Sequence, residues 1–171
     1  MQKKMLTPKG RVIRIRPLNE NDLDSLIKMY TTLSDSTLKY MRAERFTEEE
    51  VREMFQKVDF ERVYSIVAEE KDFGIVGELR IIMHETGSGE IGFVVHDEFQ
   101  YQGIGQSLVR AAIEFARKEG IKKLIAFINE NNACSIHIFR KYGFEVEKRF
   151  GPEYHLMGKE EAVLKLALRL N

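Results

Sequence analysis

The sequence predicts a mixed α/β (α+β) fold: one sheet whose antiparallel N-terminal meander continues into a parallel crossover, with helices on both faces. Residues 63–69 and 75–84 are β-branched apolar runs joined by a short Lys-Asp-Phe-Gly turn, which predicts a hairpin. Residues 90–95 return as a third strand after a second turn at 85–89. Residues 123–128 are too apolar to be half-exposed and predict an interior strand that follows a helix in parallel. This pattern favours a sheet of about six to seven strands.

The N-terminal elements are assigned from apolar spacing and end signals. Residues 12–16 alternate apolar and basic side chains up to Pro17, which predicts a strand with one buried face. Thr47 and Glu50 form a capping box that opens a helix. The other helices expected in this half are one that Asn19 or Asn21 caps and that reaches about residue 33, and a shorter one that follows Ser34 or Asp35.

The C-terminal elements follow the same signals. An amphipathic helix after Gly105 ends at Gly120, which suits the position just beyond a helix. A second helix over 132–142 precedes strands at 144–150 and 163–170. The last strand has leucines on one face and basic residues on the other, and we expect it to be available for pairing across a homodimer.

Composition narrows the class of protein. The 171 residues fit a single domain, 1–171, with one substantial core. Lys plus Arg equals Asp plus Glu at 27 each, so there is no global field to attract nucleic acid, and we expect no direct nucleic-acid binding. No stretch approaches the ~20 apolar residues that span a bilayer. A single cysteine, Cys134, indicates a reducing compartment, so we expect a cytoplasmic protein without membrane attachment. No His, Cys and carboxylate cluster has metal-ligand spacing, so no metal is expected.

Residues 100–105, Gln-Tyr-Gln-Gly-Ile-Gly, lie between the strand 90–95 and the amphipathic helix and are typical of an anion-binding cradle. Two glycines let successive N–H groups face one point, and the helix N-terminus adds its positive dipole end. A Rossmann fingerprint would need a third glycine where Leu108 stands. A P-loop would need Lys and Ser or Thr where Gln106 and Ser107 follow. Both common nucleotide motifs are therefore excluded.

Two motifs resemble those of the GNAT superfamily of acyl-CoA-dependent N-acetyltransferases. The first is Gln100, Gly103 and Gly105, placed shortly after the central strand. The second is Asn-Ala-Cys-Ser-Ile-His-Ile-Phe-Arg-Lys-Tyr-Gly-Phe at 132–144. The resemblance covers nearly the whole chain, and residues 90–95 are similar in particular to the acetyltransferase domain of protein lysine acetyltransferases.

The resemblance implies acetyl-CoA as co-substrate. Two strands of such folds splay apart, and the exposed backbone of one pairs with the pantetheine arm while the cradle receives the pyrophosphate. Asn132 is equally explained as a helix N-cap, and Lys141 as a cation at a helix C-terminus. The positions implied for acetyl-CoA are Phe93, Val94, Val95, Gln100, Tyr101, Gln102, Gly103, Ile104, Gly105, Gln106, Ser107, Asn132, Ser135, Phe139 and Lys141.

Acetylation of an alkylamine is helped by a general base, since such amines are protonated near neutrality. One position that the family uses for the base is Phe127 here, which cannot accept a proton. The other is the start of the central strand, where Glu90 stands, so the resemblance implies Glu90 as the base, directly or through water. Glu78 and His96 are the reserve candidates.

The family's usual general acid is a tyrosine on the second motif helix, and Phe139 occupies that position. Tyr142 lies three residues further on and faces another side of the helix, so Tyr154, His155 or solvent is left as the proton donor. Cys134 could support an acetyl-cysteine route, but a lone cysteine on a helix is more often buried, and direct attack is favoured.

The sequence thus predicts transfer of an acetyl group from acetyl-CoA to a primary amine. A protein lysine or N-terminal amine stands ahead of a polyamine, amino acid or drug-like amine as acceptor, and a non-catalytic CoA-binding sensor is the alternative from another class. The acceptor is expected between the helices of residues 20–58 and the loop 150–160.

Overall fold

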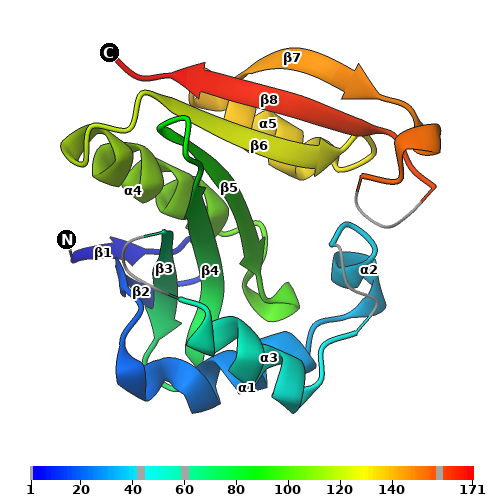
Figure 1. Ribbon diagram of the computed structural model, residues 1–171. Helices are drawn as coiled ribbons and strands as arrows, with labels where there is room; N and C mark the ends of the chain where they lie inside the picture. Colours follow the sequence, from blue (N-terminus) through cyan, green and yellow to red (C-terminus); the bar gives the residue numbers. More distant parts are fainter. Residues whose placement is uncertain (1, 42–44, 59–61, 157–159) are drawn as a thin grey trace.

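The computed structural model describes residues 2–41, 45–58, 62–156 and 160–171, which form one mixed sheet with helices on both faces (Figure 1). Its strands are ordered β1-β2-β3-β4-β5-β6-β8-β7, and β5 with β6 is the parallel pair. The predicted meander and crossover are therefore confirmed. The strands are β1 Lys3–Leu6, β2 Val12–Pro17, β3 Val63–Glu70, β4 Gly74–Met83, β5 Ser88–Val95, β6 Lys123–Asn129, β7 Glu145–Phe150 and β8 Val163–Arg169.

Several helices begin at a residue whose side chain caps the first turn. Asn19 caps the short 3-10 helix η1, Glu20–Asp22, which leads into α1, and Ser34 caps α2. Thr47 and Glu50 make the predicted capping box of α3. The helices are α1 Leu23–Thr31, α2 Asp35–Leu38, α3 Glu48–Gln56, α4 Ile104–Lys118 and α5 Ala133–Lys141, with further 3-10 turns η2 Asp97–Phe99 and η3 Pro152–Tyr154.

The sheet has eight strands, more than the six or seven expected. The added strand is β1, whose Lys-Lys-Met-Leu sequence is too short and charged to signal a strand. It is ordered by pairing with β2, from Lys3 opposite Ile15 to Leu6 opposite Val12. Pairing with a neighbour, rather than local propensity, therefore decides the structure here.

The predicted turn at 85–89 ends earlier than expected, because Ser88 and Gly89 already belong to β5. A Cβ atom on Gly89 would lie 2.9 Å from Cγ2 of Ile81 and 3.2 Å from Cδ2 of Leu124. The glycine is thus required by close packing of β4 and β6 around β5, although glycine is also a common turn residue.

The expectation that the last strand pairs across a homodimer is wrong for this strand. β8 lies between β6 and β7 and is antiparallel to both. Ala167, for example, stands opposite Ile125 on one side and Glu145 on the other. Both edges of β8 are used within the chain, because β7 folds back along its outer side.

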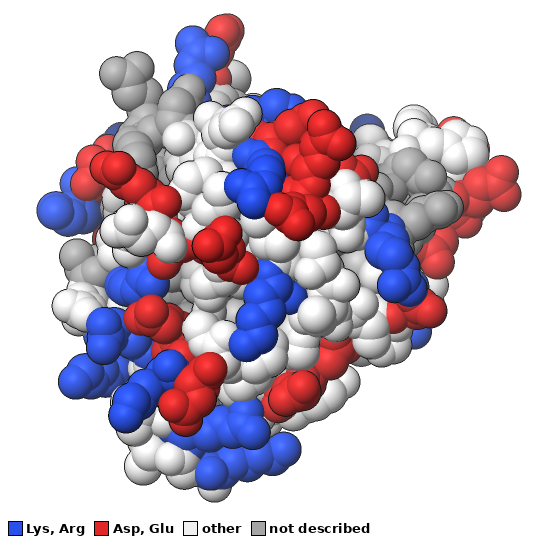
Figure 2. Space-filling model, turned by 90° about the horizontal axis from the view of Figure 1, so that it is seen from below, with Lys and Arg blue, Asp and Glu red and all other residues white. Residues whose placement is uncertain are grey.

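Two apolar clusters cover the two faces of the sheet. One packs α4 and α5 against the strands and includes Leu108, Leu124 and Phe139. The other packs α1 and α3 on the opposite face, around Leu26 and Val51. Within the described residues, no helix is long and apolar enough to cross a membrane. The face seen in Figure 2 mixes basic and acidic side chains, without one sign covering it.

The strands β5 and β6 separate after a short paired stretch, as Figure 1 shows. They pair only from Ser88 opposite Lys123 to Glu90 opposite Ile125, whereas β5 stays paired with β4 as far as Val95. Hydrogen-bonding direction alternates along a strand, and the carbonyl of Ser88 accepts from His84 on the β4 side. Phe93 therefore directs its backbone groups into the gap between β5 and β6.

Candidate active site

Two adjoining cavities open where β5 and β6 separate. The cradle cavity, about 540 Å³, lies between residues 100–106, the start of α5 and the α2 segment at 36–41. The strand cavity, about 400 Å³, lies over β4 and β5 and reaches β6 and α3. The residues that border both cavities are Tyr40, Met41, Phe93, Val94, Asn132 and Ser135. The cavities therefore meet over the middle of β5.

The cradle is formed by the turn into α4. Gly103 has φ +82°, a left-handed conformation that favours glycine, and provides no side-chain cap. The first helical bond runs from the N–H of Ser107 to the carbonyl of Gly103. The N–H groups of Ile104, Gly105 and Gln106 consequently have no intrahelical acceptor, and they stand at the positive end of the helix dipole. This arrangement favours an anion.

Gly105 has a separate role, because a Cβ atom there would lie 2.8 Å from Cε2 of Phe93 and 3.3 Å from Cδ1 of Ile138. The glycine lets the first turn of α4 pack closely on β5. The two motif glycines thus act differently: Gly103 sets the turn, and Gly105 brings the helix N-terminus to the strand.

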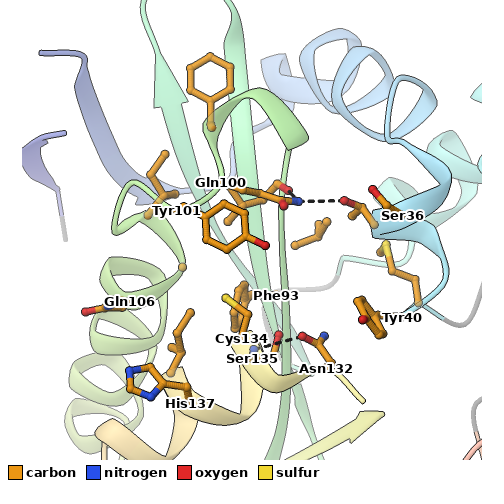
Figure 3. Close-up of a pocket in the computed structure, with 18 of the residues that line it drawn as sticks. Ser36, Tyr40, Phe93, Gln100, Tyr101, Gln106, Asn132, Cys134, Ser135 and His137 are labelled. Carbon is orange, nitrogen blue, oxygen red and sulfur yellow. Dashed lines mark hydrogen bonds between the residues drawn. The ribbon is translucent and has the colours of Figure 1, made fainter. Parts of the chain in front are cut away.

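Gln100 braces the cradle against its surroundings. Its Nε2 donates to Oγ1 of Thr37 at 2.8 Å (Figure 3). The same nitrogen donates to the carbonyl of Val95 at 3.0 Å. The motif glutamine therefore joins the end of β5 to α2. Val94 directs its backbone groups to β4, where it stands opposite Glu78, so Phe93 and Val95 are the two predicted backbone positions that face the gap.

A second set of hydrogen bonds holds α2 in place. The Asp97 carboxylate accepts from the N–H of Ser34 at 2.9 Å, from Oγ1 of Thr37 at 2.6 Å and from the Ser34 hydroxyl. Burial raises the pKa of the Asp97 carboxyl, but the hydrogen bonds from Ser34 and Thr37 lower it by more, so the pKa is lowered overall. The charged carboxylate is the form that fixes α2.

Sequence reasoning placed the acceptor at the helices of residues 20–58 but did not predict that the α2 segment forms a wall of the cradle cavity. Ser36, Lys39, Tyr40 and Met41 border the cradle cavity, and Figure 3 shows Tyr40 across the cavity from the α4 side. The available local signal was the Ser34 cap, which predicts a helix start and no function. The role of the segment arises only when Asp97 docks it against β5.

Three positions implied for acetyl-CoA do not border either cavity, namely Gln102, Ser107 and Lys141. Gln102 is buried beneath the cradle, where its Nε2 donates to the carbonyl of Glu98. Lys141 is exposed and donates to Oε1 of Gln106 at 2.7 Å. Lys141 thus stands beside the cradle, whereas the Gln102 side chain supports it from below.

The α5 motif supplies the far wall of both cavities. Asn132 accepts at Oδ1 from the N–H of Ser135 at 3.2 Å, so the N-cap interpretation is confirmed, and both residues also border the cavities (Figure 3). Cys134 was expected to be buried and is exposed instead, bordering the cradle cavity with His137. The reason is that the first turn of α5 faces the cavity rather than the core.

The carboxylates near the strand cavity differ in their partners. Glu90 borders the cavity, with its side chain 22% exposed and Oε2 at 3.4 Å from Nε2 of His84. Glu78 also borders it but is buried and accepts from Tyr30, Ser65 and Arg80. A carboxylate with three donors is poorly placed to take a further proton, so Glu78 is disfavoured as a base.

The other reserve base, His96, does not border either cavity. It is buried, with Nε2 at 3.0 Å from Oγ1 of Thr32, and its Nδ1 accepts from the N–H of Glu98 at 3.4 Å. β5 ends at Val95, and the chain turns into η2 at this point. His96 therefore leaves the cavity-facing side that Glu90, Gly92 and Val94 share.

The residues considered for the proton-donor role also differ in whether they border a cavity. Phe139 borders the strand cavity and packs against Phe93 and Phe144. Tyr154 is 57% exposed and packs edge-to-face with Phe150, and it borders neither cavity. Of the expected acceptor region, residues 42–44 and 157–159 lie outside the described residues.

Tyr142 and His155 likewise do not border the cavities. Tyr142 packs against the core at the end of α5, and His155 is exposed just after η3. Among the described residues that border both cavities, Tyr40 is the one that carries a phenol. Its hydroxyl makes no hydrogen bond with another described residue.

Comparison with known proteins identifies the protein family. A model of the acetyltransferase (GNAT) domain matches residues 13–145. The chain therefore belongs to the GNAT acetyltransferase family, whose reaction is acetyl transfer to an amine. Across the described part of the chain, no group of three or more His, Cys, Asp or Glu side chains could hold a metal ion.

Curated relatives include small-molecule acetyltransferases. The chain is 23% identical to spermidine N(1)-acetyltransferase of Escherichia coli (strain K12) over 166 residues, covering 94% of this chain and 88% of that one. It is 38% identical to an L-methionine sulfoximine/L-methionine sulfone acetyltransferase of Pseudomonas aeruginosa over 70 residues, 41% of each chain. The acceptors in the names of these two relatives, spermidine and methionine sulfoximine or sulfone, differ in charge.

Solved structures share the fold over almost the whole chain. The GNAT domain of S. lividans PAT has a TM-score of 0.81 at 21% identity and covers 99% of this chain and 97% of its own. A spermidine N-acetyltransferase from Vibrio cholerae, solved with CoA and spermine, has a TM-score of 0.77 at 17% identity and covers 92% and 95%.

Replacing Asp97 by Asn should weaken the docking of α2. Because the pKa of Asp97 is lowered in the folded state, its contribution is complete above the ordinary value near 3.9 and is lost as the pH falls through the lower folded value. We expect the variant to lose about 1 kcal/mol at pH 7 and less at pH 3, measured by urea unfolding. Asp72→Asn, in an exposed turn, is the control. An equal loss at both pH values would contradict this role.

Proposed function

We propose that the protein transfers an acetyl group from acetyl-CoA to the primary amine of a small molecule by direct attack. The observation that carries this proposal is the meeting of the two cavities over β5, beside Phe93 and Val94. The cradle cavity contains the helix N-terminus that favours an anion. The strand cavity has a volume of about 400 Å³ and is bordered by the Glu90 carboxylate. Such a volume is typical of small-ligand sites.

We propose a small-molecule acceptor in place of the protein amine that the sequence analysis favoured. The strand cavity is bordered by Tyr30, Phe46 and Met54 as well as by the sheet, which suits a compact amine. Two of the curated relatives are named for small acceptors, spermidine and methionine sulfoximine. Protein lysines and N-terminal amines remain the alternative and belong in the acceptor panel.

The residues present fit acetyl-CoA. The N–H groups of Ile104, Gly105 and Gln106 would hold the pyrophosphate, and Lys141 beside Gln106 would add a positive charge. The backbone of Phe93 and Val95 would pair with the amides of the pantetheine arm. Acetyl-CoA supplies the activated acetyl group as a thioester.

We assign Glu90 as the general base. Its side chain borders the strand cavity on the face of β5 that also carries Gly92 and Val94. Glu90 would take a proton from the ammonium form of the acceptor, directly or through a water, and leave the lone pair of the neutral amine free to attack the carbonyl. His84, 3.4 Å away, would orient the carboxylate.

We assign Tyr40 as the donor of a proton to the departing thiolate, in place of the tyrosine that Phe139 replaces. Its phenol stands at the junction where both substrates would meet. The Asp97 hydrogen bonds fix the helix that precedes it. The acid would thus come from the segment just after α2 rather than from α5.

Gly103→Glu should abolish binding of CoA, because a carboxylate would fill and repel the anion site. Gly87→Glu is a matched control: both glycines have positive φ, +82° and +76°, and Gly87 lies in an open hairpin turn. Isothermal titration with CoA should show loss of affinity for the first variant alone. Normal affinity in Gly103→Glu would remove the cradle from the CoA site.

Glu90→Gln should lower kcat by about 10²- to 10⁴-fold with little change in CoA affinity, because a positioned base contributes on that scale. Glu85→Gln, in the exposed turn of the same hairpin, should be unaffected. Steady-state thiol release between pH 6 and 9 makes the comparison. Undiminished turnover across that range would exclude Glu90 as the base.

Tyr40→Phe should lower kcat by about 10²-fold while the KM for acetyl-CoA changes little, because the phenyl ring keeps the wall and only the proton donor is lost. Tyr154→Phe removes an exposed phenol outside the cavities and serves as control. Initial rates at saturating acceptor measure the effect. A Tyr40→Phe enzyme with wild-type kcat would exclude Tyr40 as the proton donor and leave solvent in that role.

A further inference from the structure

Arg80 stands on the wall of the strand cavity among the side chains of one sheet face. Glu78, Arg80 and Ile82 alternate along β4 and all border this cavity. Across the strand pair, Arg80 is opposite Gly92, and Ile82 is opposite Glu90. Arg80 therefore stands one same-face position along the sheet from the proposed base.

The bonds of Arg80 leave part of its guanidinium open. Nε donates to Oε1 of Glu78 at 2.9 Å, and Nη1 donates to the carbonyl of Met54 at 3.4 Å. Nη2 has no hydrogen-bond partner among the described residues. The Arg80 side chain is 19% exposed, whereas that of Glu78 is fully buried. The Glu78 carboxylate also accepts hydrogen bonds from Tyr30 and Ser65, so it does not need a further bond from Nη2 of Arg80.

There is also open space opposite Arg80 on β5. A Cβ atom on Gly92 would meet no heavy atom within 4 Å. The missing side chain opposite Arg80 leaves an opening within the cavity, roughly 7 Å along β5 from Glu90. Burial lowers the pKa of Arg80, but neighbouring Glu78 and Tyr30 raise it by more, so the group is charged.

We propose that the acceptor is a primary amine that also carries a carboxylate or similar oxyanion, as α-amino acids do, and that Arg80 binds this group. This inference rests on the proposed function and names its substrate class. A guanidinium presents a planar pair of N–H donors that matches an oxyanion, and burial strengthens the interaction. Glu90 would then lie near the amine while Arg80 holds the acid.

The alternatives fit this charge arrangement less well. A polyamine bound with one amine near Glu90 would place a second ammonium in the position beside Arg80, where the like charges repel. The amine of a lysine side chain has no carboxylate within a few bonds of it. The acceptor class is thus selected by the one cationic side chain among the described residues that border the strand cavity.

The test measures kcat/KM for matched acceptors with acetyl-CoA: methionine, its sulfone, methioninamide, spermidine and a lysine-containing peptide. We expect the two acids to exceed methioninamide by about 10- to 100-fold, since a charge-assisted bidentate contact is lost in the amide. Equal values for acid and amide, or the highest value for spermidine or the peptide, would overturn the inference and leave the acetyltransferase function standing. Absence of thiol release with every acceptor would refute the proposed function itself.

Variants separate recognition from structural support. Arg80→Gln should remove the preference for the acids while changing kcat/KM for methioninamide less than about 3-fold. Arg80→Lys keeps a cation beside Glu78 but loses the planar fork, and it should show an intermediate preference. Arg52→Gln, an exposed arginine paired with Glu48 on α3, is the control and should match wild type.

If kcat/KM falls by the same factor for the acids and for methioninamide in both Arg80 variants, Arg80 supports the structure of the site only. That result would contradict recognition of the acid by Arg80. Should Arg80→Gln fail to fold, Arg80→Lys and the wild-type ratio of acid to amide decide the question. Affinity for CoA, measured by titration, should be the same in all soluble variants, because Arg80 does not border the cradle cavity.

Discussion

The separation of β5 from β6 is the constraint on which the rest of the site depends. The two strands pair from Ser88 to Glu90 and then diverge, while β4 continues to hold β5 as far as Val95. Backbone polar groups that lack a strand partner need another one. The divergence therefore creates the space for two cavities and directs the backbone of Phe93 toward that space. Gly105 then allows the N-terminus of α4 to stand close to the same strand.

The opposite wall comes from a distant part of the chain. Asp97 and Gln100, which directly follow β5, hold Thr37 of α2 by hydrogen bonds. This contact brings Tyr40 to the junction of the cavities. The groups proposed for donor binding, proton removal and proton donation thus gather around one strand, and Arg80 on β4 adds a charge that distinguishes acceptors.

The sequence predicted the parts of the site that local patterns specify. Gly103 and Asn132 are needed by a turn and a helix cap, so their places follow from nearby residues. Tyr40 and Arg80 were missed because their roles depend on pairing between segments far apart in the sequence. Cys134 was expected to be buried, since periodicity alone does not say which face of α5 the cavity meets. The fold was predictable for the same reason as the cradle: alternation, caps and glycines are local signals.

Amide hydrogen exchange of residues 91–95, with and without saturating CoA, tests most directly whether the diverging strand binds the acyl donor. The amides of Phe93 and Val95 face the gap and should exchange quickly in the free protein and slowly in the complex. The amide of Val94, directed at β4, should change little. Unchanged exchange at Phe93 and Val95 on saturation would contradict the claim that the donor pairs with β5 as an added strand.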